Sequence, residues 1–149
     1  MENTGIWVAV VIIVFVLGSI FGLRVSPRER ALGMMREKAR KMGLHPRLVV
    51  APDWTKVPMA TEKRASMVAY YSVLIPDARL PLMRARVVDQ KLELVQGDDK
   101  FKDFPIALKG IYAIDMQANC VGIYWDEEAD LRATQLDEMK AFLHSLAER

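Results

Sequence analysis

Carboxylates gather at two places in the chain, where they could bind a cation or serve as acid and base. The first group is Asp98, Asp99 and Asp103, which fall in one predicted loop. A calcium loop of the EF-hand type requires glycine at its sixth position and glutamate at its twelfth. Counted from Asp98, those positions hold Asp103 and Lys109. We therefore interpret this loop as solvated charge and keep a carboxylate-based enzyme as the third functional hypothesis.

The second acidic group, Asp126, Glu127, Glu128 and Asp130, precedes the last predicted helix. Negative charge is stabilised near a helix N-terminus by the helix dipole. Solvated charge is again the default interpretation of this group, ahead of a cation site or a partner site.

The histidines and the cysteine occur singly along the chain. His45 and His144 are far apart in sequence, so we expect structural or exposed roles for them and not metal ligation. Cys120 is interpreted as a small core residue, and a single cysteine cannot form an internal disulfide, which fits a reducing compartment. Walker, dinucleotide-binding, nucleophile-elbow and zinc-protease motifs are missing from the sequence. We therefore predict a non-enzymatic protein without catalytic residues, cofactor or metal.

Two features could contact a partner directly. Trp54 falls in a loop between the first two predicted strands, where it is either an exposed recognition anchor or packs back onto the sheet. Residues 24–47 contain eight basic and two acidic side chains. The candidate lipid-surface residues within this neck are Arg28, Arg36, Arg40 and Lys41.

The neck predicts a helix over residues 26–42, with a capping Ser26, Pro27 at the first helical position and a stop at Gly43. Its apolar stripe, Leu32, Met35, Ala39 and Met42, either lies on anionic lipid or packs on the protein's own domain. Nucleic acid is not a predicted partner, because residues 48–149 carry thirteen basic and sixteen acidic side chains.

Residues 5–23 form a run of nineteen without charge, long enough for a helix that crosses a bilayer of about 30 Å. We interpret the run as a retained anchor, because residues 1–4 lack the basic n-region of a secretory signal. The basic neck then predicts an external N-terminus and a cytosolic C-terminal domain. Gly18 and Gly22 form a small-xxx-small pair that could pack against another span or a second copy.

The remaining sequence predicts an α+β fold, with an antiparallel sheet or partly open barrel and a C-terminal helix. The organisation is a short N-terminus (1–4), a span (5–23), a basic juxtamembrane helix and neck (24–45) and a cytosolic domain (46–149). Strands are predicted at 46–51, 66–75, 82–88, 91–95, 111–116 and 120–125. The last helix has an apolar stripe of Leu136, Met139, Phe142, Leu143 and Leu146. One hairpin should pair Arg86 with Glu93, through a loop longer than Asp89-Gln90 because that dipeptide is not a preferred two-residue turn.

The layout of span, basic neck and small strand-rich domain resembles the small accessory subunit of the bacterial Sec translocase, although the glycine-rich strand-turn pattern of that family is missing. The segments at 26–30 (SPRER) and 124–127 (YWDE) also resemble uncharacterised single-span inner-membrane proteins of proteobacteria. This resemblance implies a bacterial inner membrane and adds no activity. The order of strands followed by a helix is similar to that of pleckstrin-homology-like barrels.

The leading functional hypothesis is a membrane-anchored accessory or scaffold protein whose cytosolic domain binds other proteins. The alternative is a domain that senses lipid at the membrane surface. A bare sheet edge or a flat apolar patch would favour the first, and a basic concave face would favour the second.

Overall fold

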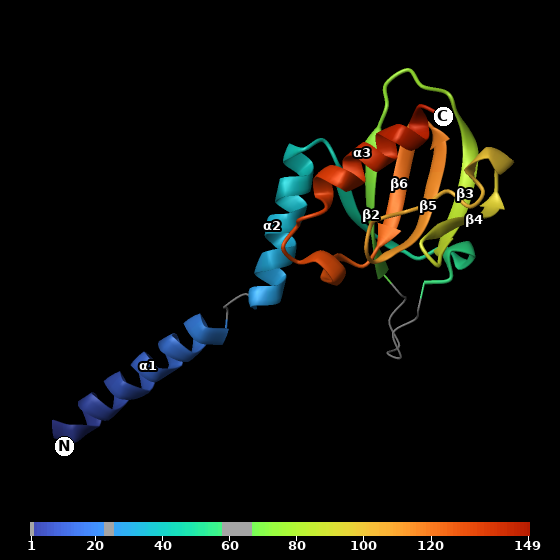
Figure 1. Ribbon diagram of the computed structural model, residues 1–149. Coiled ribbons are helices and arrows are strands. Elements are labelled where there is room, and N and C mark those ends of the chain that lie inside the picture. Colours follow the sequence, from blue (N-terminus) through green and yellow to red (C-terminus); the bar gives the residue numbers. More distant parts are fainter. Residues whose placement is uncertain (1, 23–25, 58–66) are drawn as a thin grey trace. The chain divides into compact units, whose positions relative to one another are not determined.

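The computed structural model describes residues 2–22, 26–57 and 67–149, and Figure 1 shows their elements in chain order. The chain divides into two compact units, Met1–Arg30 and Ala31–Arg149.

The first unit consists mainly of helix α1 (Glu2–Gly22). Its segment Asn3–Gly22 has a mean hydropathy of 2.6 and is entirely exposed in the isolated chain. The helix is therefore long and apolar enough to cross a membrane, a property that a secretory signal sequence near an N-terminus shares.

The second unit is built on one antiparallel sheet of six strands in the order β1-β2-β6-β5-β3-β4. The strands are β1 (His45–Val50), β2 (Met67–Leu74), β3 (Leu80–Val88), β4 (Lys91–Gln96), β5 (Ile111–Ala118) and β6 (Cys120–Trp125). The β5–β6 hairpin lies between β2 and β3, so strands distant in sequence meet at the centre of the sheet. Strands β1 and β4 form opposite edges, and the sheet does not close into a barrel.

The predicted pairing of Arg86 with Glu93 between β3 and β4 is confirmed. Arg86 lies opposite Glu93, and its Nη2 is 2.8 Å from Oε1 of that residue. The expectation of a longer loop is wrong, because Asp89 and Gln90 alone connect the strands. Both have positive φ angles, 52° and 61°, as a type I′ turn requires. Asp tolerates the left-handed region through local hydrogen bonding, whereas the structure gives no comparable reason for Gln90.

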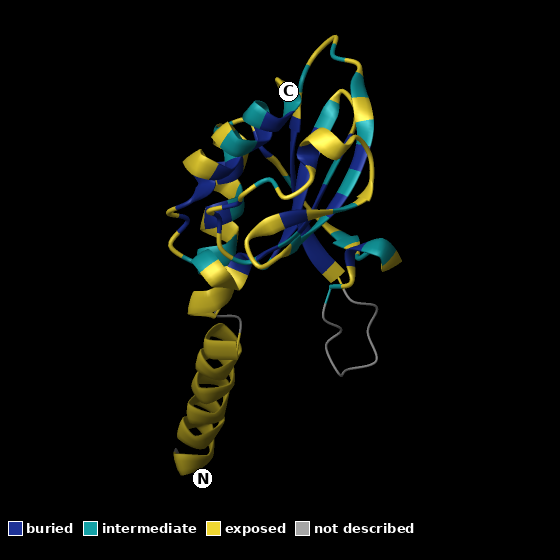
Figure 2. Cartoon of the chain, turned by 45° about the vertical axis from the view of Figure 1, so that its right-hand side comes forward, coloured by how far each residue is buried: buried dark blue, intermediate teal, exposed yellow. Residues whose placement is uncertain are grey.

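Two helices cover one face of the sheet, which we call the helix-covered face, and bury the main core (Figure 2). Helix α3 (Leu136–Ala147) places Leu136, Met139, Leu143 and Leu146 in that core, as predicted. Phe142 is only partly buried and packs beside Phe104, with ring centroids 5.8 Å apart.

Helix α2 (Pro27–Lys41) packs through Met35 and Ala39, which are fully buried in the same core. The predicted apolar stripe of the neck therefore packs on the protein's own domain. The compact unit begins at Ala31, within α2, so most of the basic helix belongs to the folded domain. The α+β class predicted for the chain is confirmed.

Candidate functional site

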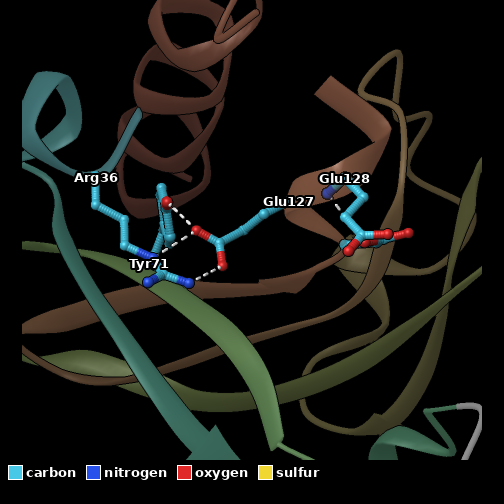
Figure 3. A network of polar contacts seen from close by, with 5 residues as sticks. Arg36, Tyr71, Glu127 and Glu128 are labelled. Atoms are coloured by element: carbon cyan, nitrogen blue, oxygen red, sulfur yellow. Dashed lines mark hydrogen bonds and ion pairs between the residues drawn. The ribbon is translucent and has the colours of Figure 1, made fainter. Parts of the chain in front are cut away.

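A partly buried ion pair joins α2 to Glu127, which follows β6 in the chain (Figure 3). Arg36 donates from Nε to Oε2 of Glu127 at 3.0 Å and from Nη2 to Oε1 at 2.7 Å. The hydroxyl of Tyr71 on β2 donates to the same Oε2 at 2.6 Å. Glu127 is 7% exposed, and its carboxylate thus accepts three hydrogen bonds away from water. Bidentate geometry of this kind is the strong form of an Arg–carboxylate contact.

Local capping explains how Glu127 comes to face inward. Asp126 accepts a hydrogen bond from the backbone N–H of Glu128 at 3.0 Å and so starts the short helix η3 (Glu127–Asp130). The expectation of solvated charge is wrong for Glu127, because the turn directs this carboxylate toward Arg36. Glu128 and Ala129 are exposed, and Asp130 accepts hydrogen bonds from Thr134 and Gln135.

The contacts keep Arg36 charged and Tyr71 protonated, as their hydrogen bonds to Glu127 require. The hydrogen bond to Glu127 raises the pKa of Arg36, which therefore stays charged. Burial raises the pKa of Tyr71, and the neighbouring Glu127 carboxylate raises it further, so the phenol remains a donor. The arrangement holds α2 against the domain through hydrogen bonds and one ion pair, so we assign it a structural role.

The opposite face of the sheet, here called the open face, carries a second polar arrangement around Asp115 on β5. Tyr70 donates to Oδ1 of Asp115 at 2.7 Å, and Tyr124 donates to Oδ2 at 3.4 Å. Arg84 is the β3 residue directly opposite Asp115. Trp54 packs edge-on against Tyr124, with ring centroids 5.8 Å apart. We call these five residues the open-face cluster.

Gly122 makes the contact between Tyr70 and Asp115 possible. Tyr70 on β2 must reach across β6 to β5, and Gly122 is the β6 residue that pairs with Asp115. A Cβ at position 122 would lie 2.0 Å from the Tyr70 ring. Glycine therefore lets the ring lie flat on the sheet and brings its hydroxyl to the carboxylate.

Burial dominates the electrostatics of the cluster. It raises the pKa of Asp115, although the hydrogen bonds from Tyr70 and Tyr124 and the charge of Arg84 act in the opposite direction. Burial and the Asp115 charge raise the pKa of both phenols. Protonated phenols beside an acceptor supply no nucleophile, and among the described residues no three His, Cys, Asp or Glu side chains lie together as a metal site would need.

Of the single residues singled out in the sequence, Trp54 belongs to the open-face cluster and Cys120 contacts it. Trp54 is half-buried and folds back onto the sheet, with the Arg84 guanidinium carbon 5.8 Å from its ring centroid. Cys120 is half-buried on the open face, with its Sγ 3.7 Å from the Tyr70 hydroxyl, so the core assignment is wrong. His45 is exposed on β1, and His144 is half-buried on α3.

The remaining candidates from the sequence, for lipid contact, helix packing and cation binding, differ in how exposed they are. Arg28, Arg40 and Lys41 are exposed on α2, whereas Arg36 is held by Glu127. Gly18 and Gly22 lie on α1, where nothing described comes within 4 Å of the place that a Cβ would take at either position. The loop carboxylates Asp98, Asp99 and Asp103 are all exposed.

Sequence reasoning missed an apolar surface at one corner of the sheet. Leu48 and Val50 on β1 and Met67 on β2 are 51%, 60% and 56% exposed. Leu48 pairs with Ala69, a core residue, and Val50 pairs with Met67, so all three side chains lie on the helix-covered face. We call them the corner patch. The alternation of Leu48 and Val50 was visible in the sequence, but their exposure was not, because it depends on where the described helices lie.

Comparison of the chain with protein-family models, with curated proteins and with solved structures finds no match.

Proposed function

We propose that the chain is a membrane-anchored, non-enzymatic accessory or scaffold protein whose folded domain binds other proteins. The observation that carries this proposal is the corner patch beside the edge of β1, with which no other described segment pairs. Exposed apolar residues are ordinary when they are scattered, but a contiguous group at a bare strand edge is typical of an interaction surface.

The anchor in this proposal is α1, retained in a bacterial inner membrane with its N-terminus outside and the domain in the cytosol. The basic residues of the neck support that orientation, because they follow the apolar helix directly. In the sequence, α1 ends at Gly22 and α2 begins at Pro27, so the linker between them is short. The domain would therefore meet partners that are themselves at the membrane.

A lipid-sensing surface is the second candidate, and the exposed Arg28, Arg40 and Lys41 support it. However, Met35 and Ala39 are buried in the domain, so α2 cannot place its apolar stripe in the lipid interface. Only an electrostatic contribution remains, of about 1 kcal/mol per basic residue near an anionic surface.

Photo-crosslinking in intact membranes tests the proposal. A benzophenone amino acid at Val50 or Met67 should give protein adducts, whereas the same group at Val95 should not. Val95 is the matched control, since it is an apolar residue on the other edge strand and is 43% exposed. Adducts only with lipid at positions 50 and 67 would favour the second candidate, and equal protein adducts at all three positions would contradict a specific surface.

A further inference from the structure

The backbone of β1 has hydrogen-bonding groups that no described residue uses, and their positions follow from the ladder. The N–H of Ile75 donates to the C=O of Asn119 at 2.7 Å, one step beyond the last β2–β6 pair, Leu74 and Cys120. Bonded pairs alternate along an antiparallel ladder. The odd-numbered residues of β2 therefore bond to β6, and the even-numbered ones bond to β1.

The partners of the even-numbered β2 residues are His45, Arg47 and Val49. It follows that Pro46, Leu48 and Val50 direct their backbone groups away from the sheet. Pro46 has no N–H to offer, which suits its place at a sheet edge. Leu48 and Val50 each direct both an N–H and a C=O outward from the edge of β1, in the plane of the sheet.

The other edge of the sheet is different, because a loop of the chain pairs with it. Leu92 of β4 donates to Phe104 and accepts from Asp103, and Ile106 donates to Gln90. Among the described residues, nothing of this kind pairs with the outer side of β1. Proteins ordinarily protect such edges with charge, short length or a covering segment. At Leu48 and Val50 the unused backbone groups coincide with exposed apolar side chains.

The side chains of β1 define the chemistry of a complementary strand. Leu48 and Val50 present an apolar surface on the helix-covered face. Arg47 points to the open face, with its guanidinium carbon 5.8 Å from the ring centroid of Tyr70. Within the described part of the chain, Arg47 has no carboxylate at ion-pair distance, and β1 itself contains no acid. Charge complementarity thus calls for an acidic residue opposite Arg47.

We propose that the occupant of this edge is an extended segment of a partner protein, added beside β1 as a seventh strand, with apolar residues alternating with acidic ones. Main-chain hydrogen bonds to Leu48 and Val50 would supply affinity, and the alternating side chains would supply specificity. This inference rests on the proposed function and names the partner of the same surface. A second copy is disfavoured, because its β1 would bring no carboxylate to Arg47.

The test removes one backbone donor from the full-length protein in its own membrane. With the benzophenone group at position 50, adduct yield is compared between Leu48→Pro and Leu48→Ala. Neither variant keeps the full leucine side chain, so the difference in their adduct yields reports mainly the loss of the outward backbone N–H at position 48. Because that N–H does not bond to β2, the proline should leave the sheet intact. We expect Leu48→Pro to give at least about fivefold less adduct than Leu48→Ala, as the loss of a donor to a buried carbonyl would predict.

A second measurement does not depend on proline. The partner residues crosslinked from position 48 and from position 50 should be two residues apart in one segment of the partner. This spacing is expected because paired strands have the same rise per residue. If Leu48→Pro does not fold, Val50→Pro with the group at position 48 replaces it, since Val50 has the same outward N–H.

Equal adduct yields from the proline and alanine variants, or contacts scattered over the partner, would overturn strand addition while leaving protein binding intact. An adduct with β1 of a second copy would overturn the proposal that the occupant is an acidic segment of another protein. A lack of protein adducts even in the parent chain would reject the proposed function itself.

Discussion

Arg36 and Arg40 show how residues of one type on one helix can have separate roles. Arg36 forms a bidentate pair with a buried carboxylate, whereas Arg40 lies 3.6 Å from Glu37 in an exposed pair. A buried pair is not necessarily stabilising compared with apolar residues, but the removal of one partner leaves an uncompensated charge. The two arginines therefore form a matched test.

We predict that Arg36→Ala lowers the free energy of unfolding by about 3–5 kcal/mol, because Glu127 then remains buried without its cation. Arg40→Ala should change it by less than about 0.5 kcal/mol, as is usual for an exposed residue. Chemical denaturation of the full-length protein in detergent measures both values. Similar losses from the two variants would show that the ion pair does not join α2 to the domain.

Asp115 leads to a prediction about pH. Its pKa is raised above the ordinary 3.8 in the folded protein, so the folded state binds a proton more readily than the unfolded chain does. The resulting stabilisation is present at low pH and is lost as the pH rises through the folded pKa. An asparagine at this position has no carboxyl group and cannot titrate in this way.

The stability of the parent protein relative to Asp115→Asn should therefore increase as the pH is lowered from about 8 to about 4. Denaturation of both proteins at each pH gives this difference in stability. The contributions of the other titrating groups are nearly the same in both proteins and largely cancel. A difference that stays constant with pH, or that falls toward acid, would contradict the raised pKa.

At the scale of elements, the contact between Tyr70 and Asp115 depends on three neighbouring strands. Gly122→Ala should displace the Tyr70 ring and cost about 1–3 kcal/mol of stability, as overpacking does. In a Tyr70→Ala background the added methyl group has room, so the cost should fall. Additive losses in this double-mutant cycle would mean that the ring is not the cause.

Gly33→Ala is the control for this substitution. Gly33 lies in α2, and nothing described comes within 4 Å of the place that a Cβ would take there. Replacement of a helical glycine by alanine stabilises by about 0.5–1 kcal/mol when no clash arises. The two changes should therefore have opposite signs in the same denaturation experiment.

The elements themselves were largely predictable, because local patterns determine them. All six strands and the apolar stripe of α3 follow from alternation and helical spacing in the sequence. The polar arrangements were not predictable. Glu127 is 91 residues from Arg36, and Asp115 is 45 residues from Tyr70. Such pairs depend on strand order, in which the β5–β6 hairpin inserts beside β2, and no local pattern encodes that order.

At the scale of the whole molecule, helix α1 and the folded domain offer two separate places for contact. Gly18 and Gly22 would let a second helix approach α1 closely, while the corner patch offers a surface on the folded unit. If one partner used both, the two contacts would reinforce each other, because the second becomes intramolecular once the first has formed. The basic residues of α2 would add only attraction to lipid.

Replacing both Gly18 and Gly22 by Ile should reduce recovery of a crosslinked complex from solubilised membranes by about fivefold, equivalent to about 1 kcal/mol, because the larger side chains separate the helices. Val14→Ile with Val16→Ile is the control, since it adds bulk where side chains are already large. Reversal of Arg28, Arg40 and Lys41 to Glu should have a smaller effect that diminishes with salt, and Arg36 is left unchanged because the fold requires it. Full recovery with Ile at both glycine positions would reject docking through the span and leave the corner patch as the contact surface. A larger loss from the charge reversals would instead favour the lipid-surface alternative.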